Sequence, residues 1–136
     1  MHPIVRNILA VILGFILGSM VNMALIQLSG IIIPPPEGTD VSNMESLKAT
    51  MHLFESKHFL FPFLAHALGT LVAAFVVTKL AVTHIKKLVL LIGMLFLFAG
   101  IINIILLPSP LWFTIVDLLA YIPMAYLGWV LGGKRE

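Results

Sequence analysis

A histidine and an aspartate inside long apolar runs are the residues of this chain best suited to chemistry. His66 lies in the run FLFPFLAHALGTLVAAFVV, and Asp117 is the only acidic residue inside any such run. An imidazole hydrogen-bonded to a carboxylate is common in proton relays and behind metal-binding histidines. The two residues therefore form a predicted ligand or proton site, provided that their helices bring them together.

Other polar residues lie at a similar depth or one helical turn away. With a rise of 1.5 Å per residue, His66, Asp117 and Asn103 all lie roughly 7–11 Å inside the same end of their helices. Asn22 joins this predicted polar layer if the first span leaves the hydrocarbon near Ser29, and lies nearer mid-membrane if the span stays buried to Ile33. Tyr121, one turn below Asp117, and Thr70 are further candidates for the site. The layer has two main interpretations: a structural cluster that fixes helix pairing or a subunit interface, or a site for a proton, ion or small polar solute that is open to one side.

A second group of residues has the types, but not the geometry, of a metal site. His52, Glu55 and His58 recur at a spacing of three, and zinc accepts histidine and carboxylate ligands. Six residues of an ideal helix turn through about 600°, which leaves His52 and His58 roughly 120° apart. They converge only if the helix breaks near Lys57. We therefore predict no metal and no other cofactor, and these three residues are the candidates if a metal binds.

Four apolar runs must position these side chains, at about residues 8–33, 59–82, 88–107 and 111–131. Each is long enough to cross a bilayer, whose hydrocarbon core of roughly 30 Å needs about 20 residues of helix. The chain of 136 residues is 60% hydrophobic and 10% charged, whereas a soluble domain is about 25% charged. We expect an all-α integral membrane protein, a four-transmembrane-helix antiparallel bundle that forms one domain over residues 1–136.

The segment 34–58 is the only long connection, and it contains a signal for a short amphipathic helix. Pro34 opens a run of prolines that ends the first span. Ser42 followed by Glu45 fits a capping box. Apolar residues then recur at helical spacing, at Met44, Leu47, Met51 and Phe54. This pattern predicts a helix on the membrane surface or over the mouth of the bundle.

Lysine and arginine predict the orientation. One side of the predicted bundle collects Arg6, Lys79, Lys86, Lys87, Lys134 and Arg135, and the other has Lys48 and Lys57. The positive-inside rule then places both termini in the cytoplasm. The strings PPPEG and FPFLAHALGTL resemble stretches of small bacterial membrane proteins, a resemblance that implies no activity. We expect a multi-pass protein of the cell membrane, the inner membrane of a bacterium.

Several function classes are excluded or disfavoured. The chain has no cysteine and a net charge of only +2, so thiolate chemistry is excluded and nucleic acid is not an expected partner. No G-x-S-x-G, H-E-x-x-H or phosphate-binding loop is present, so we do not expect an enzyme. The first expected function is an accessory subunit that contacts lipid and a membrane-protein partner or further copies of itself. The alternative is a small transporter or channel-like protein that uses His66 and Asp117.

Two GxxxG motifs bear on this choice. Gly14 and Gly18 form one in the first span, and Gly128 and Gly132 form the other in the last. Small residues at this spacing let membrane helices approach closely, either within one chain or between two copies. We expect packing within one chain.

Overall fold

The computed structural model describes residues 1–133, and this part of the chain is helical without any strand. Four helices are long: α1 (Pro3–Ile32), α3 (Leu60–Leu80), α4 (Ile85–Leu106) and α5 (Leu111–Leu131). A short helix, α2 (Met44–Thr50), and two 3-10 turns, η1 (Met51–Leu53) and η2 (Ser56–Phe59), lie between α1 and α3. All four long helices are long and apolar enough to cross a membrane. The predicted all-helical class and the four long apolar helices are confirmed.

The helix ends differ from the predicted spans by a few residues. α1 begins at Pro3, because proline suits the first helical turn and the His2 side chain accepts a hydrogen bond from the Ile4 amide at 3.3 Å. α3 ends at Leu80 and α4 begins at Ile85. The proline runs at Pro34 and at Pro108 and Pro110 separate the other long helices as predicted.

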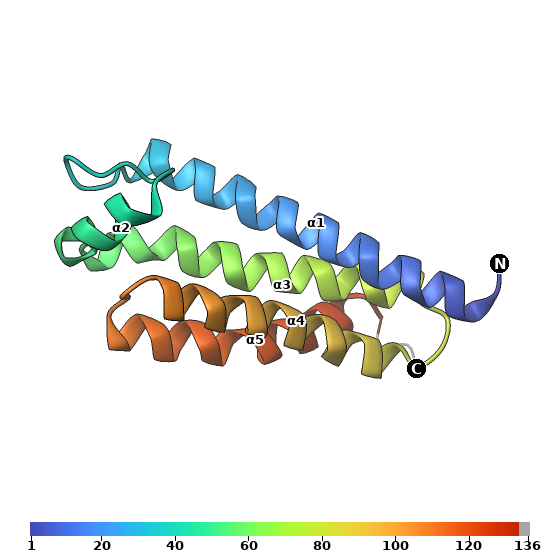
Figure 1. Cartoon of the computed structure of the whole chain (residues 1–136). Helices are drawn as coiled ribbons and strands as arrows, with labels where there is room; N and C mark the ends of the chain where they lie inside the picture. Colours follow the sequence, from blue (N-terminus) through green and yellow to red (C-terminus); the bar gives the residue numbers. More distant parts are fainter. Residues whose placement is uncertain (134–136) are drawn as a thin grey trace.

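The long helices lie side by side, and the chain reverses direction between each and the next (Figure 1). α3 contacts each of the other three, and α4 also packs on α5. We call residues 34–59 the cap, the end of the molecule that they cover the cap end, and the end at the turn 81–84 the turn end. The first residues of α1 lie at the turn end (Figure 1). α3 is thus the helix on which the others are assembled.

Small residues allow α1 and α5 to approach α3 closely. A Cβ atom added to Gly14 or Gly18 would collide with the backbone of α3, at Ala73 and Gly69 respectively. A Cβ added to Gly128 would likewise collide with the Leu71 carbonyl of α3. Both GxxxG motifs therefore serve helix contacts inside the molecule, which is the use expected from the sequence.

Two apolar clusters fill the space between the helices. The larger lies toward the turn end and includes Val77, Ile85, Ile92, Phe96 and Trp129. The smaller lies beneath the cap and consists of three buried residues, Met51, Phe59 and Phe113.

Helix α2 begins with a different N-cap residue from the one that the sequence pattern indicated. The Asn43 side chain accepts hydrogen bonds from the amides of Glu45 and Ser46, at 2.9 and 3.1 Å, and so caps α2. The predicted capping box at Ser42 and Glu45 is wrong by one position. The Ser42 hydroxyl instead donates to Asp40 at 2.6 Å, because the tight turn before α2 places these two side chains together. The predicted apolar face of the cap does point inward at Met51, which is buried.

Candidate functional site

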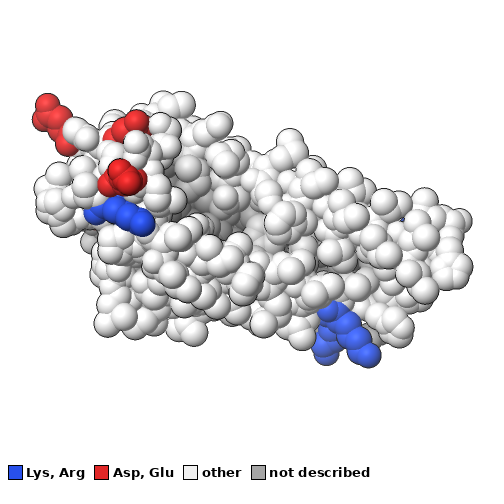
Figure 2. Space-filling model, in the orientation of Figure 1, with Lys and Arg blue, Asp and Glu red and all other residues white. Residues whose placement is uncertain are grey.

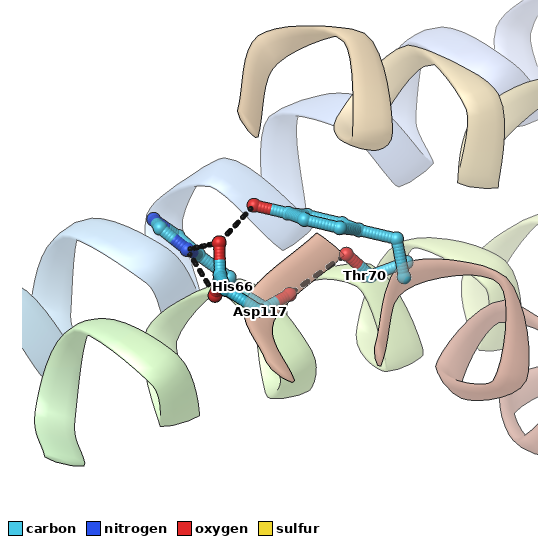
Figure 3. Close-up of polar contacts among 4 residues, drawn as sticks. His66, Thr70 and Asp117 are labelled. Atoms are coloured by element: carbon cyan, nitrogen blue, oxygen red, sulfur yellow. Dashed lines mark hydrogen bonds and ion pairs between the residues drawn. The ribbon is translucent and has the colours of Figure 1, made fainter. Parts of the chain in front are cut away.

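His66 of α3 and Asp117 of α5 are in direct contact. The His66 Nδ1 atom lies 2.8 Å from Asp117 Oδ1 and 3.0 Å from Oδ2. Figure 3 shows the two side chains pointing toward each other from neighbouring helices. The Asp117 side chain is only 1% exposed, whereas 16% of the His66 side chain is exposed. The carboxylate is therefore buried behind an imidazole that faces open space.

Tyr121 lies on the other side of the carboxylate. Its hydroxyl donates to Asp117 Oδ2 over 3.4 Å, a long hydrogen bond. Its ring also stacks against the His66 imidazole, with centroids 5.8 Å apart and an angle of 25° between the planes. Because Tyr121 and Asp117 are one helical turn apart on α5, this helix supplies both groups that hold the imidazole.

Thr70 contacts the backbone of His66 and does not line the surface of the site. The Thr70 hydroxyl donates to the backbone carbonyl of His66 at 2.7 Å, one turn earlier in α3 (Figure 3). Thr70 is fully buried and lines neither cavity described below. A threonine hydroxyl that bonds the carbonyl four residues back satisfies its own polar atom inside an apolar helix.

A cavity of about 300 Å³ lies between the cap and the His66–Asp117 pair. We call it the cap-end cavity. Its floor includes His66 and Asp117, and its roof includes Leu47, Met51 and Phe54 of the cap. This volume is at the lower end of the range for small-molecule sites, which are mostly apolar and carry a few polar groups.

A second cavity of about 110 Å³ adjoins it toward the middle of the molecule. We call it the side cavity. His66, Asn22 and Asn103 line both cavities, so the two spaces meet at these side chains. Phe15 and Ser19 of α1 and Phe96 of α4 lie on its wall. The imidazole thus stands where the two spaces join.

Asn22 and Asn103 are not bonded to the histidine–aspartate pair. Within residues 1–133 neither amide side chain makes a hydrogen bond to protein. The predicted polar layer therefore divides into two parts. His66, Asp117 and Tyr121 form a connected network, while the two asparagines present free amide groups to the cavities.

Several cavity residues carried no chemical signal in the sequence. The aromatic walls come from Phe54, Phe59 and Phe113, which look like ordinary apolar residues of a helix. Gly100 of α4 also lines both cavities. A Cβ atom there would collide with the Tyr121 hydroxyl. Gly100 therefore makes the room in which Tyr121 reaches Asp117.

The bonding pattern determines what the site offers to a bound molecule. With Asp117 ionised, the hydrogen on Nδ1 points to the carboxylate, and the Nε2 atom is free to accept a hydrogen bond or a proton. Nε2 has no hydrogen-bond partner in the part of the chain that the structure describes. Among the described residues, no lysine or arginine lines either cavity. In that form, and within residues 1–133, the site offers a buried Asp117 carboxylate and an unbonded His66 Nε2 atom, without a lysine or arginine beside them.

The three weak metal candidates are not brought together. His52 is exposed in η1, whereas His58 is buried in η2. Both His58 ring nitrogens are engaged: Nδ1 accepts the Glu55 amide hydrogen at 2.8 Å, and Nε2 lies 3.2 Å from the Pro34 carbonyl. Residues 1–133 contain no group of three or more side chains placed to hold a metal ion. His58 instead ties the cap to the end of α1.

Comparison with protein-family models, with curated proteins and with solved structures finds no match to this chain. The geometry of the cavities and of the His66–Asp117 pair is therefore the ground on which a function can be argued.

Proposed function

We propose that this chain is a multi-pass membrane protein in which α1, α3, α4 and α5 cross the bilayer as an antiparallel four-helix bundle. The length and apolar character of these helices support this proposal. So does their surface, because large apolar side chains are exposed along all four helices. In water such a surface would promote aggregation, whereas in a bilayer it would contact the lipid chains.

The distribution of charge supports an orientation with the turn end in the cytoplasm. Figure 2 shows acidic side chains gathered at the cap end, with a basic side chain beside them, and a separate basic group toward the turn end. Arg6, Lys79, Lys86 and Lys87 belong to the turn end, while Lys134 and Arg135 lie outside the described residues. By the positive-inside rule the cap end faces outward, into the periplasm of a bacterium with two membranes.

We propose further that the protein is a small transporter that takes up a proton, together with a small ligand, at His66. The observation that carries this proposal is the 2.8 Å contact between His66 and Asp117 at the floor of the cap-end cavity. Ionisable groups inside membrane helices are costly, and they commonly mark substrate and proton pathways. The titratable groups that line the cavity are His58 from the cap, His66 from α3 and Asp117 from α5, with Tyr121 behind them.

The packed turn-end half favours a transporter over an open channel. Val77, Ile92, Phe96 and Trp129 fill the space below the site. A solute in the cap-end cavity would meet this apolar cluster before it could reach the turn end. The structure therefore fits one state of a carrier, in which the site is open toward the cap end.

The GxxxG motifs do not favour the other expected function, an accessory subunit of a membrane complex, because Gly14, Gly18 and Gly128 are used in contacts with α3. A membrane-protein partner or a homo-oligomer stays a prediction. Native mass in mild detergent, with identification of co-eluting proteins, tests it independently of the site.

The proton proposal is tested with the purified full-length protein in liposomes that contain a pH-sensitive dye. An imposed pH gradient should produce dye-detected proton movement above that of empty liposomes. Asp117→Asn and His66→Ala should each abolish this excess. Asn7→Ala is the matched control, because Asn7 makes polar contacts at the turn end, to Thr83 and Val82. Equal flux in the parent, Asp117→Asn and His66→Ala would show that the site carries no proton.

A further inference from the structure

The two cavities extend to the side of the molecule, between α1 and α4. α1 packs along α3, but contacts α4 at few positions. One of these is the Phe15–Phe96 ring pair, with centroids 5.5 Å apart. Toward the cap end from this pair, residues of both α1 and α4 line both cavities. Figure 2 shows the surface hollowed between the charged cap end and the middle of the molecule.

The rim of this lateral opening is partly exposed and carries polar groups. On α1 it is formed by Asn22, Ile26 and Ser29, and on α4 by Asn103 and Ile104. Ile26 is 38% exposed, and Asn103 is exposed as well. The side chains of Asn22, Ser29 and Asn103 make no hydrogen bond to any residue among 1–133. Unpaired amides facing hydrocarbon are costly, so this rim suits the passage of a molecule with a polar head.

The wall of the cap-end cavity is apolar and aromatic. Phe59 and Phe113 line it next to the roof residues Met51 and Phe54, and Leu107 packs against this cluster. Phe59 and Phe113 pack with ring centroids 4.8 Å apart. A wholly polar solute would leave most of this wall unused, whereas an apolar tail would bury it. The cavity therefore fits a molecule with both a tail and a head.

The floor of the cavity selects the chemistry of the head. A carboxylate or phosphate head would approach the Asp117 anion, and no lysine or arginine of the described residues lines the space to compensate it. A neutral hydroxyl can donate a hydrogen bond to the free Nε2 atom of His66, whose other nitrogen is held by Asp117 at 2.8 Å. Free amide groups on Asn22 and Asn103 can contact the same hydroxyl or a neighbouring oxygen.

We propose that this cavity binds a neutral, hydroxyl-headed amphiphile that enters from the lipid through the opening between α1 and α4. This inference rests on the proposed membrane function and names the ligand class of the same site. The hydroxyl donates to His66 Nε2, and the tail lies along the aromatic wall and out through the lateral opening. Aliphatic alcohols, acylglycerols and quinols share this chemistry.

The test uses the full-length protein in lipid nanodiscs and a long-chain alkanol that carries a photoreactive diazirine near the end of its tail. Labelled peptides are identified by mass spectrometry as the probe concentration rises. Saturable labelling of the α1 and α4 segments that line the opening is expected. An excess of 1-dodecanol should abolish the saturable labelling. Dodecanoate should not, because its head is negatively charged, and dodecane should not, because it has no hydrogen-bond donor.

Variants separate binding at the site from general partition into lipid. His66→Ala should weaken saturable labelling about fivefold to tenfold, the effect of losing one hydrogen bond to the head. Ile104→Trp, at the rim, should reduce it through obstruction of the opening. Ile105→Trp is the matched control, because Ile105 is 77% exposed and does not line the cavity. Competition by dioctanoylglycerol or by decylhydroquinone would then identify the class of alcohol.

Labelling that rises without saturation, or that is equal in the parent and in His66→Ala, would overturn the inference. Competition by dodecanoate as strong as that by dodecanol would also overturn it. These outcomes are separable from the proton assay. Proton flux that depends on Asp117, without saturable alkanol labelling, would support the proposed function and contradict only the binding of an amphiphile. Saturable labelling without proton flux would support the binding of an amphiphile and contradict the proposed transport.

Discussion

His66 and Asp117, which are 51 residues apart in the chain, join α3 to α5 through an Nδ1–Oδ1 distance of 2.8 Å. The carboxylate accepts from the imidazole on one side and from the Tyr121 hydroxyl on the other. A buried anion with two donors from its surroundings is held in one position. This contact both stabilises the helix pair and orients the imidazole toward the cavity.

A double-mutant cycle should show that these two residues interact energetically. Interhelical hydrogen bonds in membranes contribute on the order of 1–2 kcal/mol at most, and we expect His66→Ala and Asp117→Asn to couple by about that amount. His66→Ala alone should destabilise more than Asp117→Asn, because it leaves the carboxylate buried with only Tyr121. Unfolding by SDS in mixed micelles, followed by circular dichroism, measures each variant. Additive effects would mean that the contact contributes nothing to stability.

Gly100 should be required for the position of Tyr121. In Gly100→Ala the new methyl group collides with the tyrosine hydroxyl and ring. Overpacking of this kind costs about 1–3 kcal/mol, and it should also move Tyr121 away from Asp117. Gly30→Ala is the control, because nothing lies within 4 Å of a Cβ there. That change should be neutral or stabilise by up to about 1 kcal/mol, since alanine favours helix. Equal stability of both variants in the SDS assay would contradict the close contact.

Gly18→Val should separate α1 from α3 and widen the lateral opening. The added side chain would meet the Gly69 carbonyl and the Ala73 methyl group. The chain has no cysteine, so spin labels can be attached at Cys residues introduced at Leu13 and Leu68, both of which are exposed. The distance between the two labels, measured by electron paramagnetic resonance, should lengthen in Gly18→Val. Gly30→Val should leave it unchanged, and a similar lengthening there would point to a general loosening of α1.

The turn before α2 should depend on pH through Asp40. Hydrogen bonds from the Ser42 hydroxyl and amide, at 2.6 and 3.0 Å, hold the pKa of the Asp40 carboxyl below its ordinary value. A carboxyl with a lowered pKa favours the folded turn at pH values above its ordinary pKa, and this contribution disappears as the pH falls through the lowered pKa. In Ser42→Ala the pKa should rise toward the ordinary value. Carbon-13 NMR titration of the Asp40 carboxyl measures it, and an unchanged pKa would show that the hydroxyl does not bind the carboxylate in solution.

Depth along the helices predicts that His66 and Asp117 lie at one level, and the two side chains are indeed in contact. The prediction works for this pair because helical rise converts sequence position into height, and both residues sit at the same height on adjacent helices. Asn22 and Asn103 line the cavities together with His66, but they bond to neither His66 nor Asp117. Equal height leaves open which helices are neighbours and which way each side chain points.

Local sequence signals are accurate to about one residue where turn geometry decides the outcome. Ser42 and Asn43 are both suitable helix caps by residue type. Asn43 caps α2 because Asp40 and Ser42 bind each other in the preceding turn. Such competition between neighbouring side chains depends on backbone angles that a residue pattern does not specify.

Composition and the fixed rise of a helix are enough to predict four long apolar helices, the prolines that end them, and the polar residues at a shared depth. They do not predict that α1 packs along α3 and contacts α4 at few positions, or that an imidazole faces the resulting cavity. Those features come from the packing of the helices in three dimensions. Because these helices are apolar on nearly every side, their hydrophobic pattern carries little information on which face meets which neighbour. The fit of Gly14, Gly18 and Gly128 against α3 determines the arrangement instead.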